Sequence, residues 1–219
     1  MSNISANLNK VLSELPKHVQ LVAVSKTKSE QEILQAYEAG QRIFGENKIQ
    51  EMTDKQANLP SDIQWHMIGH VQTNKVKYMA PYVQLIHGVH KMKLLKEINK
   101  EAKKNERVID CLLQIKIAEE DTKYGMDLAT AEEILSGDVY TQMKNVKIVG
   151  LMGMATFTED TQQIHKEFEY LSQAFNQLKL QHPELKILSM GMSGDYKIAL
   201  EHQSNMLRIG SAIFGARNY

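Results

Sequence analysis

Eight short apolar segments recur along the 219 residues, and a helical or polar stretch follows each of the first seven. Uninterrupted apolar runs of this length are typical of strands that are buried on both faces, as in parallel sheets. In chain order the predicted strands are 22–26, 42–45, 63–68, 83–87, 108–117, 146–151, 186–189 and 206–209. Their alternation with helices predicts an α/β protein built from parallel βαβ units, and the count of eight favours a (β/α)8 TIM barrel. An open doubly wound sheet is the alternative.

An extra helix is expected ahead of the first strand. Apolar residues recur at helical spacing over 4–15, and Pro16 follows them. Further helices are predicted over 30–39, 47–57, 74–79, 91–104, 128–135, 161–180 and 195–203. No linker rich in proline, glycine or serine interrupts this series, and the length is near the lower limit for the barrel. We therefore expect residues 1–219 to form a single domain.

Charge and cysteine content limit the function classes. The 26 lysine and arginine residues balance the 26 aspartate and glutamate residues, so no overall positive field argues for a nucleic-acid partner. The single cysteine, Cys111, cannot form an internal disulfide, which fits a reducing compartment. No signal peptide and no segment of membrane-spanning length is apparent. We expect a cytoplasmic monomer that binds neither nucleic acid nor membrane.

The first predicted strand ends on Ser25-Lys26. A lysine at the end of a buried strand can be held in partly desolvated surroundings, where its amine loses a proton more easily and becomes nucleophilic. Schiff-base lysines commonly arise in this way. Taken alone, the segment favours a solvated lysine that merely ends a strand.

Small residues and hydroxyls follow the last two predicted strands, in 191–195 and 210–212. Small residues let backbone amides approach a phosphate closely, and barrels often bind phosphate with the loops after strands seven and eight. A glycine-serine turn by itself is usually only a turn. In a barrel, however, these loops would face Lys26, and a lysine facing a phosphate cup is the arrangement that holds pyridoxal 5′-phosphate.

Arg208, on the eighth predicted strand, would lie near the floor of that cup. Arginine does not give up its proton, so beside the pyridine nitrogen it would disfavour the pyridinium form. The cofactor would then be a weak electron sink. Pairing of Arg208 with a carboxylate such as Glu201 is the alternative.

The remaining candidates are less specific. The histidines His66, His70, His87 and His90 lie on separate elements without metal-ligand spacing, so we expect no metal site. Most methionines fall at core spacings, but Met154 and Met192 could pack against a cofactor ring. Asn47 follows the second strand. Cys111 lies mid-strand, where a buried, inert thiol is expected.

Seven motifs in order resemble the pyridoxal phosphate homeostasis protein family, related to the N-terminal domain of alanine racemase. They are AVSKTK (23–28), FGEN (44–47), WHMIGH (65–70), QTNK (72–75), LMGM (151–154), LSMGMS (188–193) and RIGSAIFGAR (208–217). The resemblance extends over essentially the whole chain, from residue 22 to 219.

The resemblance implies a barrel that holds pyridoxal 5′-phosphate as an aldimine on Lys26. It also implies roles for seven further residues. The phosphate would contact Ser193, Gly210 and Ser211; Arg208 would lie near the ring nitrogen; Asn47, Met154 and Met192 would line the ring.

The chain departs from the family pattern at three positions. Ser211 replaces the usual threonine and keeps its hydroxyl, and Gly194 stands where a polar residue is common. Lys116 on the fifth strand stands where many relatives carry a small polar residue. A second amine facing the site would matter, so the direction of Lys116 is an open question.

Family members are described as carriers or regulators in vitamin B6 and amino-acid metabolism, without an established reaction. We expect a carrier that buffers intracellular pyridoxal 5′-phosphate, with pyridoxal-phosphate-dependent apo-enzymes as recipients. The fold-related racemase takes its second acid-base group from an extra domain of a partner subunit, and here only ten residues follow the last strand.

Two alternatives remain. One is a low-activity enzyme, such as an amino-acid racemase, with Tyr124, His66 or Lys116 as the second base. The other is a regulatory interaction module in which the cofactor is only structural.

Overall fold

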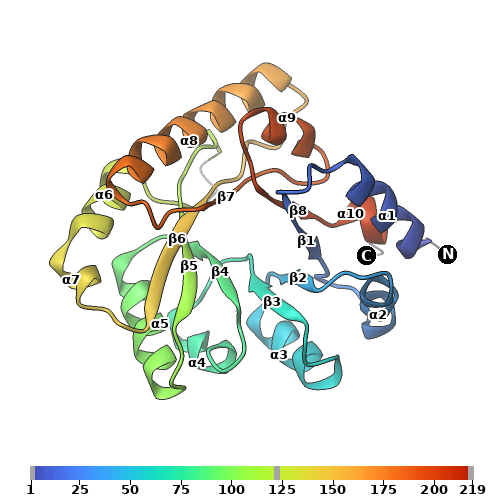
Figure 1. The fold of residues 1–219 in the computed structure, drawn as a ribbon, viewed down its shortest axis with the longest axis horizontal. Helices are drawn as coiled ribbons and strands as arrows, with labels where there is room; N and C mark the ends of the chain where they lie inside the picture. The colour runs from blue at the N-terminus through green and yellow to red at the C-terminus, as the bar shows by residue number, and fades with distance from the viewer. Residues whose placement is uncertain (1–2, 121–123, 217–219) are drawn as a thin grey trace.

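The structure is a computed structural model that describes residues 3–120 and 124–216. Eight parallel strands follow one another around a ring, and β8 pairs with β1 to close it into a barrel (Figure 1). The closed ring confirms the predicted (β/α)8 barrel and excludes the open sheet. The strands are β1 (Gln20–Val24), β2 (Ile43–Glu46), β3 (Gln64–Met67), β4 (Leu85–Val89), β5 (Ile109–Gln114), β6 (Val146–Met152), β7 (Ile187–Ser189) and β8 (Met206–Ile209).

Helices surround the barrel on its outer face (Figure 1). They are α1 (Ile4–Glu14), α2 (Glu30–Glu38), α3 (Ile49–Asn58), the 3-10 turn η1 (Thr73–Lys75), α4 (Val76–Met79), α5 (Met92–Lys104), α6 (Leu128–Ser136), α7 (Asp138–Thr141), α8 (Thr161–Gln181), α9 (Tyr196–Glu201) and α10 (Ser211–Phe214). The sequence did not predict the short helices α7 and α10, because four residues are too few to show a helical period. In the described residues, no helix is both long enough and apolar enough to cross a membrane.

Two predicted strands lie two residues away from their observed positions. The first ends at Val24 rather than Lys26, because a turn follows in which the Lys28 amide donates to the Ser25 carbonyl at 3.0 Å. The fourth begins at Leu85 rather than Val83, whose amide still donates to Met79 at the end of α4 at 2.9 Å. In both cases a local turn uses a backbone carbonyl or amide that the sheet would otherwise have bonded. The apolar side chains in these segments do not indicate which of the two hydrogen bonds forms.

Side chains on each strand alternate between the barrel interior and the surrounding helices. On β1, Val22 belongs to an interior cluster, whereas Leu21 and Ala23 belong to the main core between strands and helices. The interior cluster consists of Val22, Leu85, Leu112, Val149, Met152 and Met206. Cys111 points the other way, into the main core, where full burial raises the pKa of its thiol. This agrees with the expected inert cysteine.

The N-terminal helix α1 is present as predicted and packs beside α10, at the last turn of the chain (Figure 1). Asn7 donates to the Ile213 carbonyl of α10 at 3.1 Å. Tyr196 of α9 donates to Glu14 at 2.6 Å, which raises the pKa of the phenol to about 12. Helix α1 therefore supports the two helices that follow β7 and β8. Residues 121–123 of the acidic loop after β5, and residues 217–219, the first of which ends the last motif, lie outside the described residues.

Candidate functional site

A pocket of about 550 Å3 lies at the carboxyl ends of the strands. Residues that follow β1, β2, β3, β6, β7 and β8 line it, as expected for the functional end of a barrel. The eight residues expected to bind a cofactor all line this pocket: Lys26, Asn47, Met154, Met192, Ser193, Arg208, Gly210 and Ser211. The structure thus brings the eight together, and their cofactor contacts remain a prediction.

Lys26 enters the pocket because it continues the interior-facing series of β1. Val22 and Val24 precede it at intervals of two, and Val24 itself lines the pocket. The intervening Ser25 is fully buried on the opposite side, where its hydroxyl donates to Glu46 at 2.6 Å. Lys26 is half-buried, so part of its side chain is shielded from water while the residue still lines the pocket.

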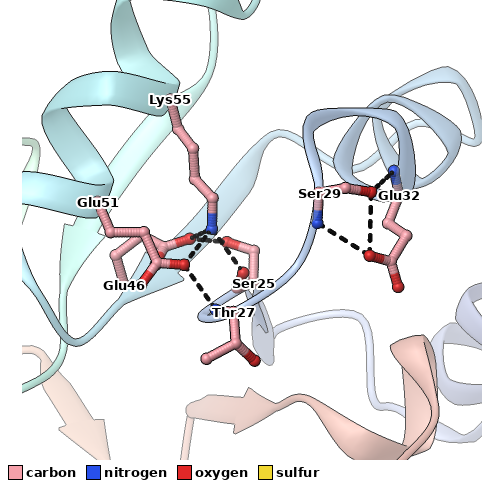
Figure 2. A network of polar contacts seen from close by, with 7 residues as sticks. All are labelled: Ser25, Thr27, Ser29, Glu32, Glu46, Glu51 and Lys55. Atoms are coloured by element: carbon pink, nitrogen blue, oxygen red, sulfur yellow. Dashed lines mark hydrogen bonds and ion pairs between the residues drawn. The ribbon is translucent and has the colours of Figure 1, made fainter. Parts of the chain in front are cut away.

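A buried lysine on α3 binds the backbone beside Lys26 (Figure 2). The ammonium of Lys55 donates to the Ser25 carbonyl at 2.8 Å, to Glu46 Oε1 at 2.8 Å and to Glu51 Oε1 at 2.7 Å. Glu46 is fully buried, and desolvation raises the pKa of its carboxyl although Lys55 acts in the opposite direction. We call Glu46, Glu51 and Lys55 the α3 cluster. The i,i+4 spacing of Glu51 and Lys55 on α3 is a sequence signal for their pairing, but their approach to Glu46 depends on the packing of α3 against β2.

The turn that contains Lys26 is also held on the C-terminal side of Lys26, at Thr27. Thr27 adopts a left-handed conformation with φ 64°, which is rare for a β-branched residue, and its amide donates to Glu51 at 2.6 Å. Two residues further on, Ser29 and Glu32 form a capping box at the start of α2 (Figure 2).

The loops after β7 and β8 form a cup of backbone amides around a hydroxyl. Ser193 Oγ accepts hydrogen bonds from the amides of Gly210 at 3.2 Å and Ala212 at 3.4 Å. A Cβ atom at Gly210 would lie 3.2 Å from Val24 Cβ, so a larger residue would crowd β1. The Lys28 ammonium donates to the Phe214 carbonyl at the end of α10 at 3.0 Å, which ties the Lys26 turn to the loop after β8. Backbone amides and hydroxyls of this kind are hydrogen-bond donors that suit a phosphate.

Arg208 lies on the floor of the pocket with only 3% of its surface exposed. Its Nη1 atom donates to the carbonyl and hydroxyl oxygens of Ser189 at 2.8 and 2.7 Å, and Nη2 donates to the Gly153 carbonyl at 2.9 Å. Burial lowers the pKa of the guanidinium to about 10, so it stays charged at neutral pH. Arg208 is therefore held by the strand ends of the barrel and not by Glu201, which lies near His165 instead.

Two histidines continue this chain of polar contacts into the barrel. Ser189 Oγ lies 3.1 Å from His87 Nδ1, and His87 Nε2 lies 3.1 Å from His66 Nδ1. Burial lowers the pKa of His66 to about 3 and also lowers the pKa of His87 well below its ordinary value. Both rings are neutral at physiological pH. His66, one of the candidate second bases, is 3% exposed and is not among the described residues that line the pocket.

Comparison with known proteins places the chain in a family. The sequence profile described as "Alanine racemase, N-terminal domain" matches residues 1–218. A pyridoxal phosphate homeostasis protein of Vibrio alginolyticus is 35% identical, with complete coverage of both chains. The chain belongs to the pyridoxal phosphate homeostasis protein family. The member from Aquifex aeolicus is 34% identical over 99% of this chain and all of its own, and that from Escherichia coli K12 is 32% identical over 100% and 99%.

Solved structures agree with the family assignment. PipY of Synechococcus elongatus, solved without pyridoxal phosphate, has a TM-score of 0.91 and 34% identity over 97% of this chain and 100% of its own. The same protein with pyridoxal phosphate bound has a TM-score of 0.88. Alanine racemase of Clostridium difficile has a TM-score of 0.80 at 13% identity, with 99% of this chain covering 57% of that one. At this identity the racemase shares the fold alone.

The rim of the pocket in this member of the homeostasis protein family contains residues beyond the eight that were expected to bind the cofactor. His70 and Tyr124 both line the pocket, with ring centroids 4.2 Å apart, and His90 lies 5.0 Å from His70. Gln114, at the end of β5, lines the pocket and donates to the Tyr124 carbonyl at 2.7 Å. The strand-end rule could have identified Gln114, since it shares the interior-facing spacing of Leu112.

Lys116, one of the three positions at which a departure from the family pattern was expected, is exposed. It is absent from the pocket lining formed by the described residues. Of the three candidates for a second base, Tyr124 alone lines the pocket.

Proposed function

We propose that this protein binds pyridoxal 5′-phosphate through Lys26 and acts as a carrier that buffers the cofactor. One observation carries the proposal: a single pocket joins a half-buried strand-end lysine, a cup of backbone amides and a buried guanidinium. The names of its relatives and the pyridoxal phosphate bound in PipY support the choice of cofactor. In this proposal the whole chain, 1–219, is one cytoplasmic, monomeric domain that supports vitamin B6 and amino-acid homeostasis.

The residues present fit the chemical groups of the cofactor. The amides of Gly210 and Ala212 with the hydroxyls of Ser193 and Ser211 suit a phosphate, because they supply donors without bulk. Asn47 Oδ1 is buried and has no hydrogen-bond partner in the part of the chain that is described. An unsatisfied buried acceptor is costly, so a bound ligand that donates to it would be stabilised. Met154 and Met192 supply polarisable surface for a ring.

Pyridoxal 5′-phosphate supplies an aldehyde, which condenses with an unprotonated amine to form a C=N bond and release one water. The residues of this chain hold that linkage without favouring catalysis. Arg208 remains charged and cannot accept a proton, so a pyridine nitrogen beside it would remain unprotonated. An unprotonated ring withdraws electrons weakly. This property favours storage and transfer to apo-enzymes over strong catalysis.

A spectrum of the purified protein tests the proposal. We expect an absorption band at about 410–430 nm, the region of a protonated imine of the cofactor. Borohydride should abolish the band and leave one label on Lys26, detected by mass spectrometry. Incubation with a pyridoxal-phosphate-dependent apo-enzyme should transfer the cofactor and activate that enzyme. A colourless protein that cannot be reconstituted would overturn the proposal.

The second candidate function is a low-activity enzyme that acts on amino acids. Tyr124 favours it, because its ring lines the pocket beside His70 and could move a proton. The test is turnover with a panel of amino acids, followed by isotope exchange at the α-carbon in deuterated water. Saturable turnover with one amino acid that is lost in Tyr124→Phe would replace the carrier function by this one.

Replacing Ser193 with alanine tests the phosphate cup. Ser193→Ala removes a hydroxyl that contacts two cup amides, so we expect affinity for pyridoxal 5′-phosphate to fall about tenfold, the effect of one charge-assisted hydrogen bond. Affinity for pyridoxal, which lacks the phosphate, should not change. Ser13→Ala on the exposed face of α1 is the control. Titration of each variant with each ligand, followed by the absorption band, measures the affinities. Equal losses for the two ligands would contradict a phosphate role for Ser193.

A further inference from the structure

The α3 cluster binds the backbone on both sides of Lys26. Lys55 uses three N–H groups, one on the Ser25 carbonyl and one on each carboxylate of the cluster. An ammonium has three donors, so its hydrogen-bonding capacity is fully used. The side chains are 8% exposed for Lys55, 0% for Glu46 and 24% for Glu51. The Lys55 ammonium is therefore fixed in position by three acceptors, whereas Glu46 Oε2 is buried without a hydrogen-bond partner in the described residues.

Each carboxylate of the cluster joins Lys55 to a different residue of the Lys26 turn. Glu46 Oε1 accepts from the Ser25 hydroxyl as well as from Lys55. Glu51 Oε1 accepts from the Thr27 amide as well as from Lys55. Figure 2 shows the two carboxylates converging on one ammonium from the end of β2 and the first turn of α3.

Thr27 has a conformation that its own sequence does not favour. A β-branched residue at φ 64° is strained and persists only where the surroundings hold it. Two contacts hold it: the hydrogen bond from its own amide to Glu51, and the bond from the Lys28 amide to the Ser25 carbonyl at 3.0 Å that closes the turn. If Thr27 relaxed to a right-handed or extended conformation, the chain direction at Lys26 would change. The side chain of Lys26 would then leave the pocket.

We propose that the α3 cluster positions Lys26 for reaction, by fixing the backbone of Ser25 and the left-handed turn at Thr27. The inference rests on the proposed function, and it assigns Glu46, Glu51 and Lys55 as positioning residues that do not touch the cofactor themselves. A nucleophile displaced by about 1 Å can react about a hundredfold more slowly. The cluster should therefore control the rate of imine formation at Lys26 more than the affinity of the phosphate cup.

The central experiment compares Glu51→Ala with Glu97→Ala. Glu97 is a matched control, because its side chain is 27% exposed and it pairs with a helix lysine, Lys100, at 3.0 Å. We expect imine formation with pyridoxal 5′-phosphate to be 10- to 100-fold slower in Glu51→Ala, with inhibition by inorganic phosphate unchanged within about twofold. Glu97→Ala should react at the wild-type rate. Stopped-flow absorption provides the rates.

A rescue variant separates positioning from a general loss of structure. Glycine adopts the left-handed conformation without strain, so Thr27→Gly should restore part of the rate when it is combined with Glu51→Ala. The same change in the wild-type background should have little or no benefit. A rate in Glu51→Ala within about twofold of wild type, or a loss that Thr27→Gly leaves unchanged, would overturn the positioning role.

The hydrogen-exchange rate of the Thr27 amide tests whether the α3 cluster holds the turn, and it needs no cofactor. We expect slow exchange in the wild type and in Glu97→Ala, and fast exchange in Glu51→Ala, since the amide loses its acceptor. A wild-type protein that shows this slow exchange but forms no imine at Lys26 would contradict the proposed function, and the geometric role of the cluster would still stand. Fast exchange in the wild type would contradict the cluster itself.

Discussion

Lys26→Ala is expected to abolish covalent attachment of pyridoxal 5′-phosphate completely. The amine is the nucleophile in the proposal, and alanine leaves no group at this position that can form the C=N bond. The cup formed by Ser193, Gly210 and Ser211 is unchanged, so the variant should still bind the cofactor reversibly and with lower affinity. Borohydride reduction followed by peptide mass spectrometry should find one label per chain in the wild type and none in the variant.

The control for this variant is Lys116→Ala. Lys116 is exposed and does not belong to the described pocket lining, so its removal should leave both the label and the absorption band unchanged. Lys28 is the other informative lysine, because it lines the pocket two residues beyond Lys26. Full labelling of Lys28 in the Lys26→Ala protein would show that Lys26 is not the specific attachment site.

The second large effect is a loss of stability in mild acid. His66 and His87 are fully enclosed in the barrel and neutral, with pKa values that burial holds well below the ordinary 6.5. The unfolded chain binds protons at these residues below pH 6.5, whereas the folded chain does not until much lower pH. Folding stability attributable to the pair is therefore fully present above pH 6.5, and it is lost as the pH falls from 6.5 toward the folded-state values.

The expected size of this loss is large compared with total protein stability. Each histidine that stays neutral in the folded state lowers the free energy of unfolding by about 1.4 kcal/mol for every pH unit below 6.5. Between pH 7 and pH 5.5 the two together should lower the free energy of unfolding by about 2.5 kcal/mol. Urea denaturation at a series of pH values measures this slope.

A variant isolates the contribution of the histidine pair. His87→Gln keeps a polar side chain beside Ser189 and removes one titrating group, so the pH slope should fall by about half, whatever the stability at pH 7. His165→Gln, at a 41% exposed side chain, is the control and should leave the slope near that of the wild type. An unchanged slope in His87→Gln would show that the pair does not titrate as described.

The sequence predicted the barrel well because strand and helix alternation is a local property. Six predicted strands overlap their observed positions closely, and the first (22–26) and fourth (83–87) overlap β1 and β4 over three residues each. The errors at β1 and β4 arise where a turn takes a backbone group from the sheet. All eight expected site residues line one pocket, because the carboxyl ends of parallel strands in a barrel open on the same side.

The sequence did not reveal which polar residues act together inside the fold. His66 was a candidate base, yet it lies in the barrel interior because its position on β3 alternates with the outward-facing Trp65 and Met67. A period of two predicts that neighbours face opposite ways but does not say which one faces inward. The chain from His66 through His87 and Ser189 to Arg208 joins four strands, and no local pattern encodes it.

Lys26 shows most clearly which features the sequence reveals and which depend on the fold. A lysine after a buried strand, and glycine and serine loops after the last two strands, can be recognised in the sequence because they are local features of composition and spacing. How the turn around Lys26 is held depends on contacts that form only in the folded chain. Lys55 and Glu51 lie more than twenty residues away, and they reach this turn because barrel closure and the packing of α3 bring distant backbone groups within hydrogen-bonding distance. Such contacts depend on three-dimensional register, which spacing along the chain does not specify.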